Sequence, residues 1–388
     1  MNVRKERATM NRRLKFTLVY SLLSILVWAA TGNAAAVDQS FTLKPGWNAI
    51  FLEVEPAVTT PSVVFSGISD LQSVWQWNAR AGIVTVEFIQ NPNLLVPPDP
   101  QMLVYIPDNG VVSNLSAIQG NSAYLVQIGG TVDQILTVNG EPKIPRHQWK
   151  SNSFNLVGFH VVDGLTTFGD FFASSAAHAG QDIYVLNNAT GTWDKIVNPS
   201  SELMLRGEAF WIYCKGSSTF NGPVSATLEL SSGLHFGKKL TEQEIYLHNN
   251  TSDLTPKTIT LSLPALNDTV HYWVFDSINE VATWEPMPAS LELTVAPGDS
   301  QRVRIGVKRS GLPPDSDNQT NIGVSDGQGV SFLLPLSVTG IDYSGLWTGY
   351  ATINKVSDVN KVDASSVQDM TELPTGSEFD FRLIIHAA

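Results

Sequence analysis

Residues 45–50 read Pro-Gly-Trp-Asn-Ala-Ile, and a related stretch, Ser-Phe-Asn-Leu-Val-Gly, returns at residues 153–158. Both place an aromatic residue directly before asparagine and then continue into apolar residues. This pattern is typical of a tight turn that leads into a buried strand. Because a motif that returns in one chain indicates an internal repeat, we expect two related units that each open on this turn and strand.

Further landmarks follow the motif in the same order in both units. Each unit has a threonine-led start of a short helix, an alternating strand that ends in a turn with asparagine and glycine, and a closing apolar strand, at residues 60–65, 74–82 and 123–126 in the first unit and 166–172, 183–191 and 209–212 in the second. Threonine can cap a first helical turn, and Pro61 suits the first helical position. We therefore expect two similar β-rich repeat domains, 37–145 and 146–222, packed side by side.

A different pattern occupies residues 223–340, where evenly spaced strands show no helix signal. It is clearest at 291–308, because apolar residues alternate on both sides of a Pro-Gly turn there. Such spacing is typical of an antiparallel sandwich of the immunoglobulin type. The predicted fold class is therefore mainly β: two related β-rich repeats, each with a short helix, followed by an immunoglobulin-like antiparallel sandwich.

The last stretch, residues 341–388, opens on Leu-Trp-Thr-Gly at 346–349 and closes on an alternating strand at 379–385. A closing strand with no room for a further partner leaves a sheet edge unpaired. We expect this stretch to be an incomplete C-terminal unit, as a truncated reading frame would produce.

The N-terminus, residues 1–36, is typical of a secretory signal peptide. Six basic residues precede an apolar run of about fifteen residues at 16–30, which is shorter than the roughly twenty that a permanent membrane helix needs. Ala34 and Ala36 then place small residues where a signal peptidase requires them, so cleavage is expected after Ala36. An uncleaved membrane anchor is the alternative.

Composition narrows the functional classes. Without the six basic residues and one acid of the signal peptide, the totals of 24 and 36 become 18 Lys and Arg against 35 Asp and Glu, a net charge near −17. Because such a surface repels phosphate backbones, no nucleic-acid partner is expected. Cys214 is the one cysteine, so no internal disulfide can form. We expect a secreted or cell-surface protein that contacts the membrane only through its signal peptide before cleavage.

The motifs resemble those of a group of large, uncharacterised secreted bacterial proteins. In that group, repeated Pro-Gly-Trp-Asn-type units precede an immunoglobulin-like segment and a domain that opens with Leu-Trp-x-Gly. The matching stretches here are 45–48, the weaker 153–155, 291–308 and 346–349. The resemblance covers most of the chain after residue 36 and implies a modular surface protein without an established reaction. In the group the final domain continues past a segment like 382–386.

Catalytic patterns are weak. Glu53 and Glu55 lie two apart on a predicted strand and share one face, where paired carboxylates serve glycoside hydrolysis, although a solvated strand face is favoured. His160 and His178 lie in the second repeat with Asp163, Asp170 and Asp182 and form a further candidate cation site. The favoured interpretation is that these residues lie apart, facing solvent or partly buried. We predict no catalytic residue and no enzyme activity.

One loop is rich in oxygen ligands. Asp315, Asp317 and Asn321 lie in a stretch of the kind that calcium prefers, although the loop lacks the glycine and the distant glutamate of an EF-hand. A plain hydrophilic loop is the default interpretation. No cofactor is expected, and calcium is the one metal candidate.

Tryptophans are concentrated in the repeats. Exposed indoles on a β-surface form platforms on which sugar rings stack, and Trp75, Trp193 and Trp284 are the candidate glycan platform. Core packing is favoured for the repeat aromatics, because Trp47 and Trp211 return as Phe154 and Leu125 in the other repeat.

Two functions remain open. The leading one is an exported, non-enzymatic cell-surface or secreted modular protein with a structural or adhesive role, with surface proteins or glycans as partners. The alternative is a carbohydrate-binding or carbohydrate-processing protein that uses the repeat aromatics. Exposure of the three candidate tryptophans separates the two.

Overall fold

The computed structural model describes residues 36–81, 88, 90–108, 112–229, 232–276, 281–341, 345–352 and 378–385. Ala34 and most of the expected signal peptide lie outside these residues, and Ala36 immediately precedes the first strand. The chain is mainly β, with short helices, and divides into two compact units. The first unit holds the repeats and nearly all of the sandwich. The second comprises residues 309–317 and 339–388.

Each repeat contains one four-stranded antiparallel sheet. The strands are β2 (Gly46–Leu52), β4 (Leu71–Trp77), β5 (Met102–Tyr105) and β6 (Ser122–Ile128) in the first, and β8 (Ser153–Val157), β9 (Ile183–Asn187), β10 (Thr192–Lys195) and β11 (Phe210–Cys214) in the second. The sheets have the orders β2-β6-β4-β5 and β8-β11-β9-β10. In both, the strand of the opening motif lies at an edge beside the last strand of the same sheet, so the two sheets share one topology.

The first repeat has an additional three-stranded sheet of β1 (Val37–Leu43), β7 (Gln134–Pro142) and β3 (Val54–Pro56), in the order β1-β7-β3. The short helices are α1 (Pro61–Val64), α2 (Phe168–Phe172) and the 3-10 turns η1 (Ala79–Ala81) and η2 (Pro92–Leu94). Pro61 opens α1 as expected, while Thr60 makes no side-chain cap. Thr167 does cap α2, because its Oγ1 accepts a hydrogen bond from the Asp170 amide at 3.1 Å.

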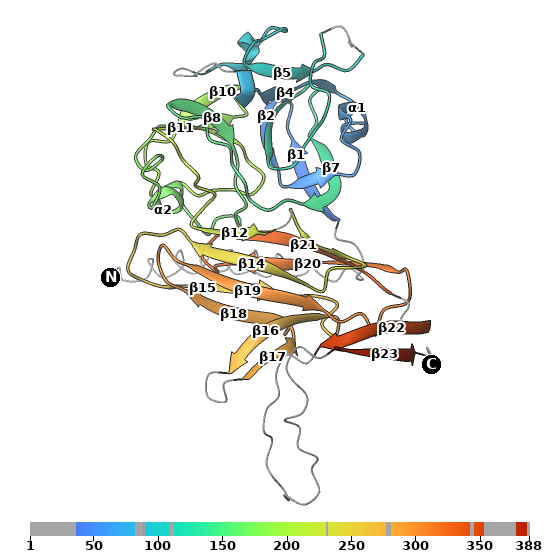
Figure 1. Cartoon of the computed structure of the whole chain (residues 1–388). Coiled ribbons are helices and arrows are strands. Elements are labelled where there is room, and N and C mark those ends of the chain that lie inside the picture. Colours follow the sequence, from blue (N-terminus) through green and yellow to red (C-terminus); the bar gives the residue numbers. More distant parts are fainter. Residues whose placement is uncertain are drawn as a thin grey trace, which may run out of the picture. The chain divides into compact units, whose positions relative to one another are not determined.

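The apolar faces of the two four-stranded sheets meet in one buried cluster, which we call the shared core. It combines Trp47, Phe51, Trp75, Met102, Val104, Ala123 and Leu125 from the first repeat with Phe154, Leu156, Trp193, Ala209 and Trp211 from the second. The two sheets therefore lie side by side (Figure 1), and the repeats expected as two domains share buried packing. Trp47, Phe154, Trp211 and Leu125 are all buried, as core positions should be.

The asparagine of each opening motif closes the turn that precedes the strand. Asn48 Oδ1 accepts from the Lys44 amide at 2.9 Å, and its Nδ2 donates to the Lys44 carbonyl at 2.7 Å. Asn155 repeats the arrangement: Oδ1 accepts from the Lys150 amide at 2.8 Å, and Nδ2 donates to the carbonyls of Lys150 and Ser153 at 3.1 and 2.9 Å. Both asparagines are buried, and each satisfies partly buried backbone groups of its turn.

Two five-stranded sheets form the sandwich. One has the order β12-β14-β19-β16-β17 and the other the order β13-β21-β20-β15-β18. The first sheet contains β12 (Val224–Leu228), β14 (Glu242–Asn249), β19 (Ser300–Val307), β16 (Val270–Asp276) and β17 (Val281–Pro286). The second contains β13 (Leu234–Gly237), β21 (Ser331–Thr339), β20 (Asp317–Ser325), β15 (Lys257–Ser262) and β18 (Ser290–Val295). β13 pairs with β21 in parallel, whereas the pairs β12-β14, β14-β19, β19-β16, β16-β17, β20-β15 and β15-β18 are antiparallel.

The second unit, described by itself, includes the antiparallel pair β22 (Gly345–Thr352) and β23 (Glu378–Ile385). Its turn segment is closed by backbone bonds, because the Gly340 amide donates to the Ser316 carbonyl at 2.9 Å and the Asp315 amide donates to the Gly340 carbonyl at 3.1 Å. The Leu-Trp-Thr-Gly motif thus lies on β22 and the closing alternating stretch on β23.

We predict that Asn155→Ala lowers the free energy of unfolding by about 2–3 kcal/mol, because it leaves buried backbone groups of the turn without partners. Asn48→Ala should have a similar effect. Chemical denaturation measures both. Asn139→Ala is the control, since Asn139 is exposed and donates one bond to Asp38, and it should change stability by no more than about 0.5 kcal/mol. Equal losses in all three variants would contradict the proposed role of the turn.

Candidate functional site

The three tryptophans of the expected glycan platform do not form a common surface. Trp75 and Trp193 are 3% and 6% exposed and belong to the shared core. Trp284 is 37% exposed but lies on β17 of the sandwich. The platform prediction is therefore corrected for Trp75 and Trp193. The cause is that each sheet covers the aromatic face of the other, so the second sheet hides Trp75 and the first hides Trp193.

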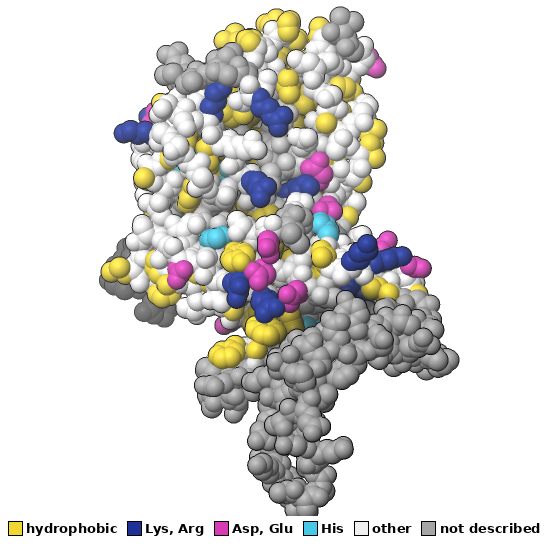
Figure 2. All heavy atoms as spheres, viewed as in Figure 1, with side chains coloured by type: hydrophobic (Ala, Val, Ile, Leu, Met, Phe, Trp, Pro, Cys, Tyr) yellow, Lys and Arg dark blue, Asp and Glu magenta, His cyan; other side chains and the backbone are white. Residues whose placement is uncertain are grey.

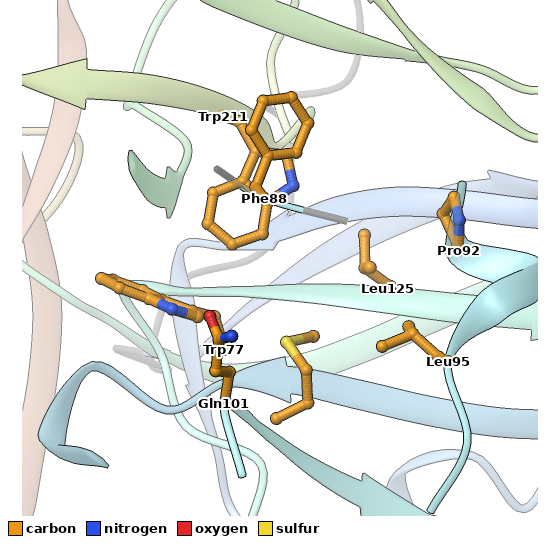
Figure 3. Close-up of a pocket in the computed structure, with 8 residues that line it drawn as sticks. Trp77, Phe88, Pro92, Leu95, Gln101, Leu125 and Trp211 are labelled. Carbon is orange, nitrogen blue, oxygen red and sulfur yellow. The ribbon is translucent and has the colours of Figure 1, made fainter. Parts of the chain in front are cut away.

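An apolar pocket opens at one side of the shared core (Figure 3). Its volume is about 20 Å³, which is room for about one water molecule. Its lining comprises Trp77, Phe88, Pro92, Leu95, Gln101, Met102, Leu125 and Trp211. Phe88 stacks on Trp211 with ring centroids 5.4 Å apart, and Trp77 meets Trp211 edge-on at 5.8 Å. Trp211 Nε1 is buried and has no hydrogen-bond partner among the described residues. The pocket thus offers mainly apolar contact.

An ion pair joins the two repeats. Arg206 Nη2 lies 2.7 Å from Glu53 Oε2, and Arg206 Nε donates to both carboxylate oxygens at 3.2 and 3.0 Å. The Glu53 side chain is only 5% exposed, whereas that of Arg206 is 48% exposed. Burial raises the pKa of Glu53, and Arg206 opposes this shift.

The solvated strand face favoured for Glu53 and Glu55 is therefore wrong for Glu53. The two carboxylates also have different partners. Glu55 accepts from the Gly120 amide at 2.9 Å and lies 3.9 Å from Lys143 Nζ. Glu53 instead faces Arg206, which lies 153 residues away in the sequence. The strand pattern alone does not show such a partner.

We predict that Arg206→Met lowers the free energy of unfolding by about 3–5 kcal/mol at neutral pH, because it leaves a buried carboxylate without its counterion. The double variant Glu53→Gln with Arg206→Met should regain much of this loss. Lys143→Met is the control, since its long contact with Glu55 is partly exposed and should contribute at most about 1 kcal/mol. Denaturant titration measures all three. Equal losses in the control and Arg206→Met would contradict the prediction.

The histidines of the second repeat are buried rather than gathered around a cation. His160 and His178 are 4% and 1% exposed. Burial, with a smaller effect of Arg206, lowers the pKa of His160 to about 3, and burial lowers the pKa of His178 to about 4. Ser175 Oγ lies 2.7 Å from His178 Nδ1. His147 packs beside Phe159 with ring centroids 4.3 Å apart, and burial lowers its pKa to about 3.

The aspartates of the same candidate cluster have other partners. Asp163 accepts from the Arg206 amide at 2.6 Å, Asp170 accepts from the Thr167 hydroxyl at 2.8 Å, and Asp182 lies 2.7 Å from Lys195 Nζ. Within the described ranges, no group of three or more His, Cys, Asp or Glu residues is arranged to hold a metal ion.

These buried histidines predict acid sensitivity. Between about pH 6.5 and pH 4 the unfolded histidines bind protons that the folded ones do not, so stability falls as pH falls, by about 1.4 kcal/mol per pH unit for each histidine. Unfolding titrations at several pH values measure this slope. His160→Leu should reduce this slope. An unchanged slope in His160→Leu would contradict the prediction.

The candidate calcium residues do not converge. Asp317 begins β20 and accepts a hydrogen bond from the Thr339 hydroxyl at 2.8 Å, while Asn321 is buried four residues further along the same strand. Four strand residues span about 13 Å, which is too far for two side chains of this length to ligate one ion. Asp315 lies in the turn before the strand, at a φ of 56°.

A surface that the sequence analysis did not identify lies on the outward side of the first sandwich sheet. Arg304 on β19 stacks over Trp273 on β16 at 4.3 Å from the ring centroid, and Trp273 meets Trp284 on β17 edge-on at 5.3 Å. On the other side Arg304 is paired with Glu242 at 2.7 Å and with Glu244 at 3.9 Å. We call Glu242, Glu244, Trp273, Trp284 and Arg304 the sandwich ladder.

Acidic, basic and apolar side chains also lie side by side on the sandwich strands in the view of Figure 2. Part of the ladder follows from alternation along the strands. Glu242 and Glu244 on β14, and Arg302 and Arg304 on β19, each alternate with buried residues, and Trp273 on β16 has partly buried neighbours. The alternation does not give the register between strands. In the structure, that register places Glu244 opposite Arg304 and Trp273 opposite Trp284.

A hollow borders the ladder. It is lined by Thr241, Glu242, His271, Trp284, Gly306 and Val307 and has a volume of about 200 Å³. This is below the range of about 300–1,000 Å³ that is typical of drug-sized ligand sites. The described part of the chain therefore offers an apolar pocket in the repeats and a mixed aromatic and polar hollow on the sandwich.

No protein-family model and no curated protein matches the chain. Among solved structures, the chain is similar to one from the "X-ray structure of the entire lipid-containing bacteriophage PM2", at 10% identity over 79% of this chain and 88% of that chain, with a TM-score of 0.14. At this TM-score the likeness carries no argument about fold or function. In the described residues no helix is long and apolar enough to cross a membrane.

Proposed function

We propose that the chain is an exported, non-enzymatic protein of the bacterial cell surface or the extracellular space, with a structural or adhesive role. The N-terminal segment 1–36 has the basic and apolar parts of a secretory signal peptide. The observation that carries the proposal is the start of β1 at Val37, directly after the expected cleavage site. Cleavage there leaves every strand of the repeats in place.

The packing of the two repeats on the shared core supports a structural role. The two sheets share one strand order and the same asparagine-closed turn, and we propose that they are diverged copies of one unit. Their stability outside the cell comes from the shared core and the Glu53–Arg206 ion pair, since the chain has a single cysteine, which is free and buried. The sandwich ladder gives this scaffold a surface suited to a partner.

We predict that the exported protein begins at Val37. Mass spectrometry of the protein recovered from outside the cytoplasm should show loss of residues 1–36. Replacing Ala34 and Ala36 together with leucine should cause the precursor to accumulate, because a signal peptidase requires small residues at these positions. Replacing Ala29 and Ala30 with leucine is the control and should leave processing unchanged. A wild-type chain that stays in the cytoplasm at full length would overturn the proposal.

The second candidate function, carbohydrate binding without catalysis, is favoured by one observation. Trp284 remains 37% exposed and forms one wall of the hollow, beside polar groups on neighbouring strands. This moves the candidate glycan surface from the repeats, where Trp75 and Trp193 are buried, to the sandwich.

A further inference from the structure

We propose that the hollow beside Trp284 binds a neutral glycan, with one sugar ring stacked on the Trp284 indole. The inference rests on the proposed role of the chain as an exported adhesive protein and specifies the ligand class. It is carried by the packing of Trp284 against Gly306, two strands away, and by the polar groups that surround this contact.

The indole of Trp284 covers the backbone of the sheet. A Cβ at Gly306 would lie only 2.8–3.2 Å from three atoms of the six-membered ring of Trp284. Only glycine permits this contact. The ring therefore packs against β19 across the intervening strand β16, while part of the side chain remains exposed to solvent. An indole held against a sheet in this way presents an apolar surface on which the C–H face of a sugar can stack.

Polar groups border this surface at positions that match the hydroxyls of a sugar. Gly306 is opposite Glu242 on one neighbouring strand and opposite His271 on the other. Glu242 Oε2 accepts from Arg304 at 2.7 Å, and Oε1 is the second acceptor of the same carboxylate. His271 Nδ1 lies 3.3 Å from the Thr269 carbonyl, which only accepts. In the tautomer in which Nδ1 donates to this carbonyl, Nε2 is an acceptor.

The charged side chains of β14 and β19 beside the hollow are paired. Arg304 is paired with Glu242 at 2.7 Å, and Arg302 is paired with Glu244 at 3.5 Å. Two guanidinium groups thus face two carboxylates, so these four charges largely offset one another. This balance favours a neutral hydroxylated ligand over an anionic polysaccharide or a basic peptide.

Arg304 also holds the aromatic part of the site in place. Its guanidinium lies 4.3 Å from the Trp273 centroid and 5.5 Å from the Trp284 centroid. Both indoles therefore contact a group that is itself fixed by Glu242, and this limits their rotamers. A side chain ordered before binding loses less conformational entropy when a ligand arrives.

The test uses the full chain as the cell processes it and an array of neutral oligosaccharides of glucose, galactose, mannose and N-acetylglucosamine, with oligogalacturonate as the anionic probe. We expect retention of at least one neutral glycan and not of oligogalacturonate. Isothermal titration should then show that Trp284→Ala weakens binding by about tenfold or more, because both stacking and burial of apolar surface are lost.

Two further variants separate binding from folding. Gly306→Ala keeps every polar group and displaces the ring, so it should also weaken binding, while circular dichroism reports whether the sandwich stays folded. Phe275→Ala is the matched control, since Phe275 is an aromatic residue on β16 that is 62% exposed and does not line the hollow. It should bind like the wild type.

Three outcomes would overturn the inference. They are no binding of any neutral glycan by the exported wild-type chain, binding of oligogalacturonate alone, and equal binding by Trp284→Ala and Phe275→Ala. The first outcome would leave the exported, adhesive role intact, because export is measured separately by cleavage at Val37. Failure of export with intact glycan binding would instead overturn the proposed role and leave the site.

Discussion

The packing of two four-stranded sheets on one aromatic core is the constraint on which the repeat region depends. Each sheet carries large side chains on the face that the other covers, including Trp47 and Trp75 from the first sheet and Trp193 and Trp211 from the second. Such rings bury large apolar areas and prefer the edge-on and offset contacts that are observed here. Because no disulfide contributes, this burial is the main source of stability for the repeats.

Polar groups then specify how the sheets meet. Asn48 and Asn155 close the turns that start the edge strands, and the Glu53–Arg206 pair links the repeats beside the buried His160. The Phe51 amide donates to the Gly207 carbonyl at 2.7 Å, and the Ala209 amide donates to the Ala49 carbonyl at 3.2 Å. Apolar packing tolerates sliding of one sheet over the other, whereas these buried bonds are satisfied in one register.

The sandwich uses the same residue types for a different purpose. In the repeats, tryptophans lie between two sheets, whereas on the sandwich Trp273 and Trp284 lie on an outward face with charged neighbours. The aromatic content of the chain therefore serves both stability and a candidate binding surface. The distinction lies in whether a second layer covers the face. This is why Trp284 is suited to contact a partner and Trp75 is not.

Local patterns were sufficient for much of the architecture. Alternation and turn residues predicted a mainly β chain, the strand at the motif 45–50, and the sandwich strands around 291–308, because these features depend on neighbouring residues. The core role of Trp47 and Phe154 was also predictable, since an apolar type is kept at both positions of the pattern. Within the candidate site, only Trp284 was predicted from the sequence. Trp273 and Arg304 are 31 residues apart, and only strand pairing brings them together.

The sequence by itself thus determined the mainly β character of the chain and many of its strands and turns, since these follow from the chemistry of adjacent residues. Only the tertiary structure decided which side chains are covered. Trp193 is buried because the other repeat covers it, and Glu53 is ion-paired because the other repeat supplies Arg206. Trp284 on β17 contacts Gly306 on β19 because sheet pairing places these strands on either side of β16. Burial and pairing depend on residues far apart in the chain, and no local pattern encodes them.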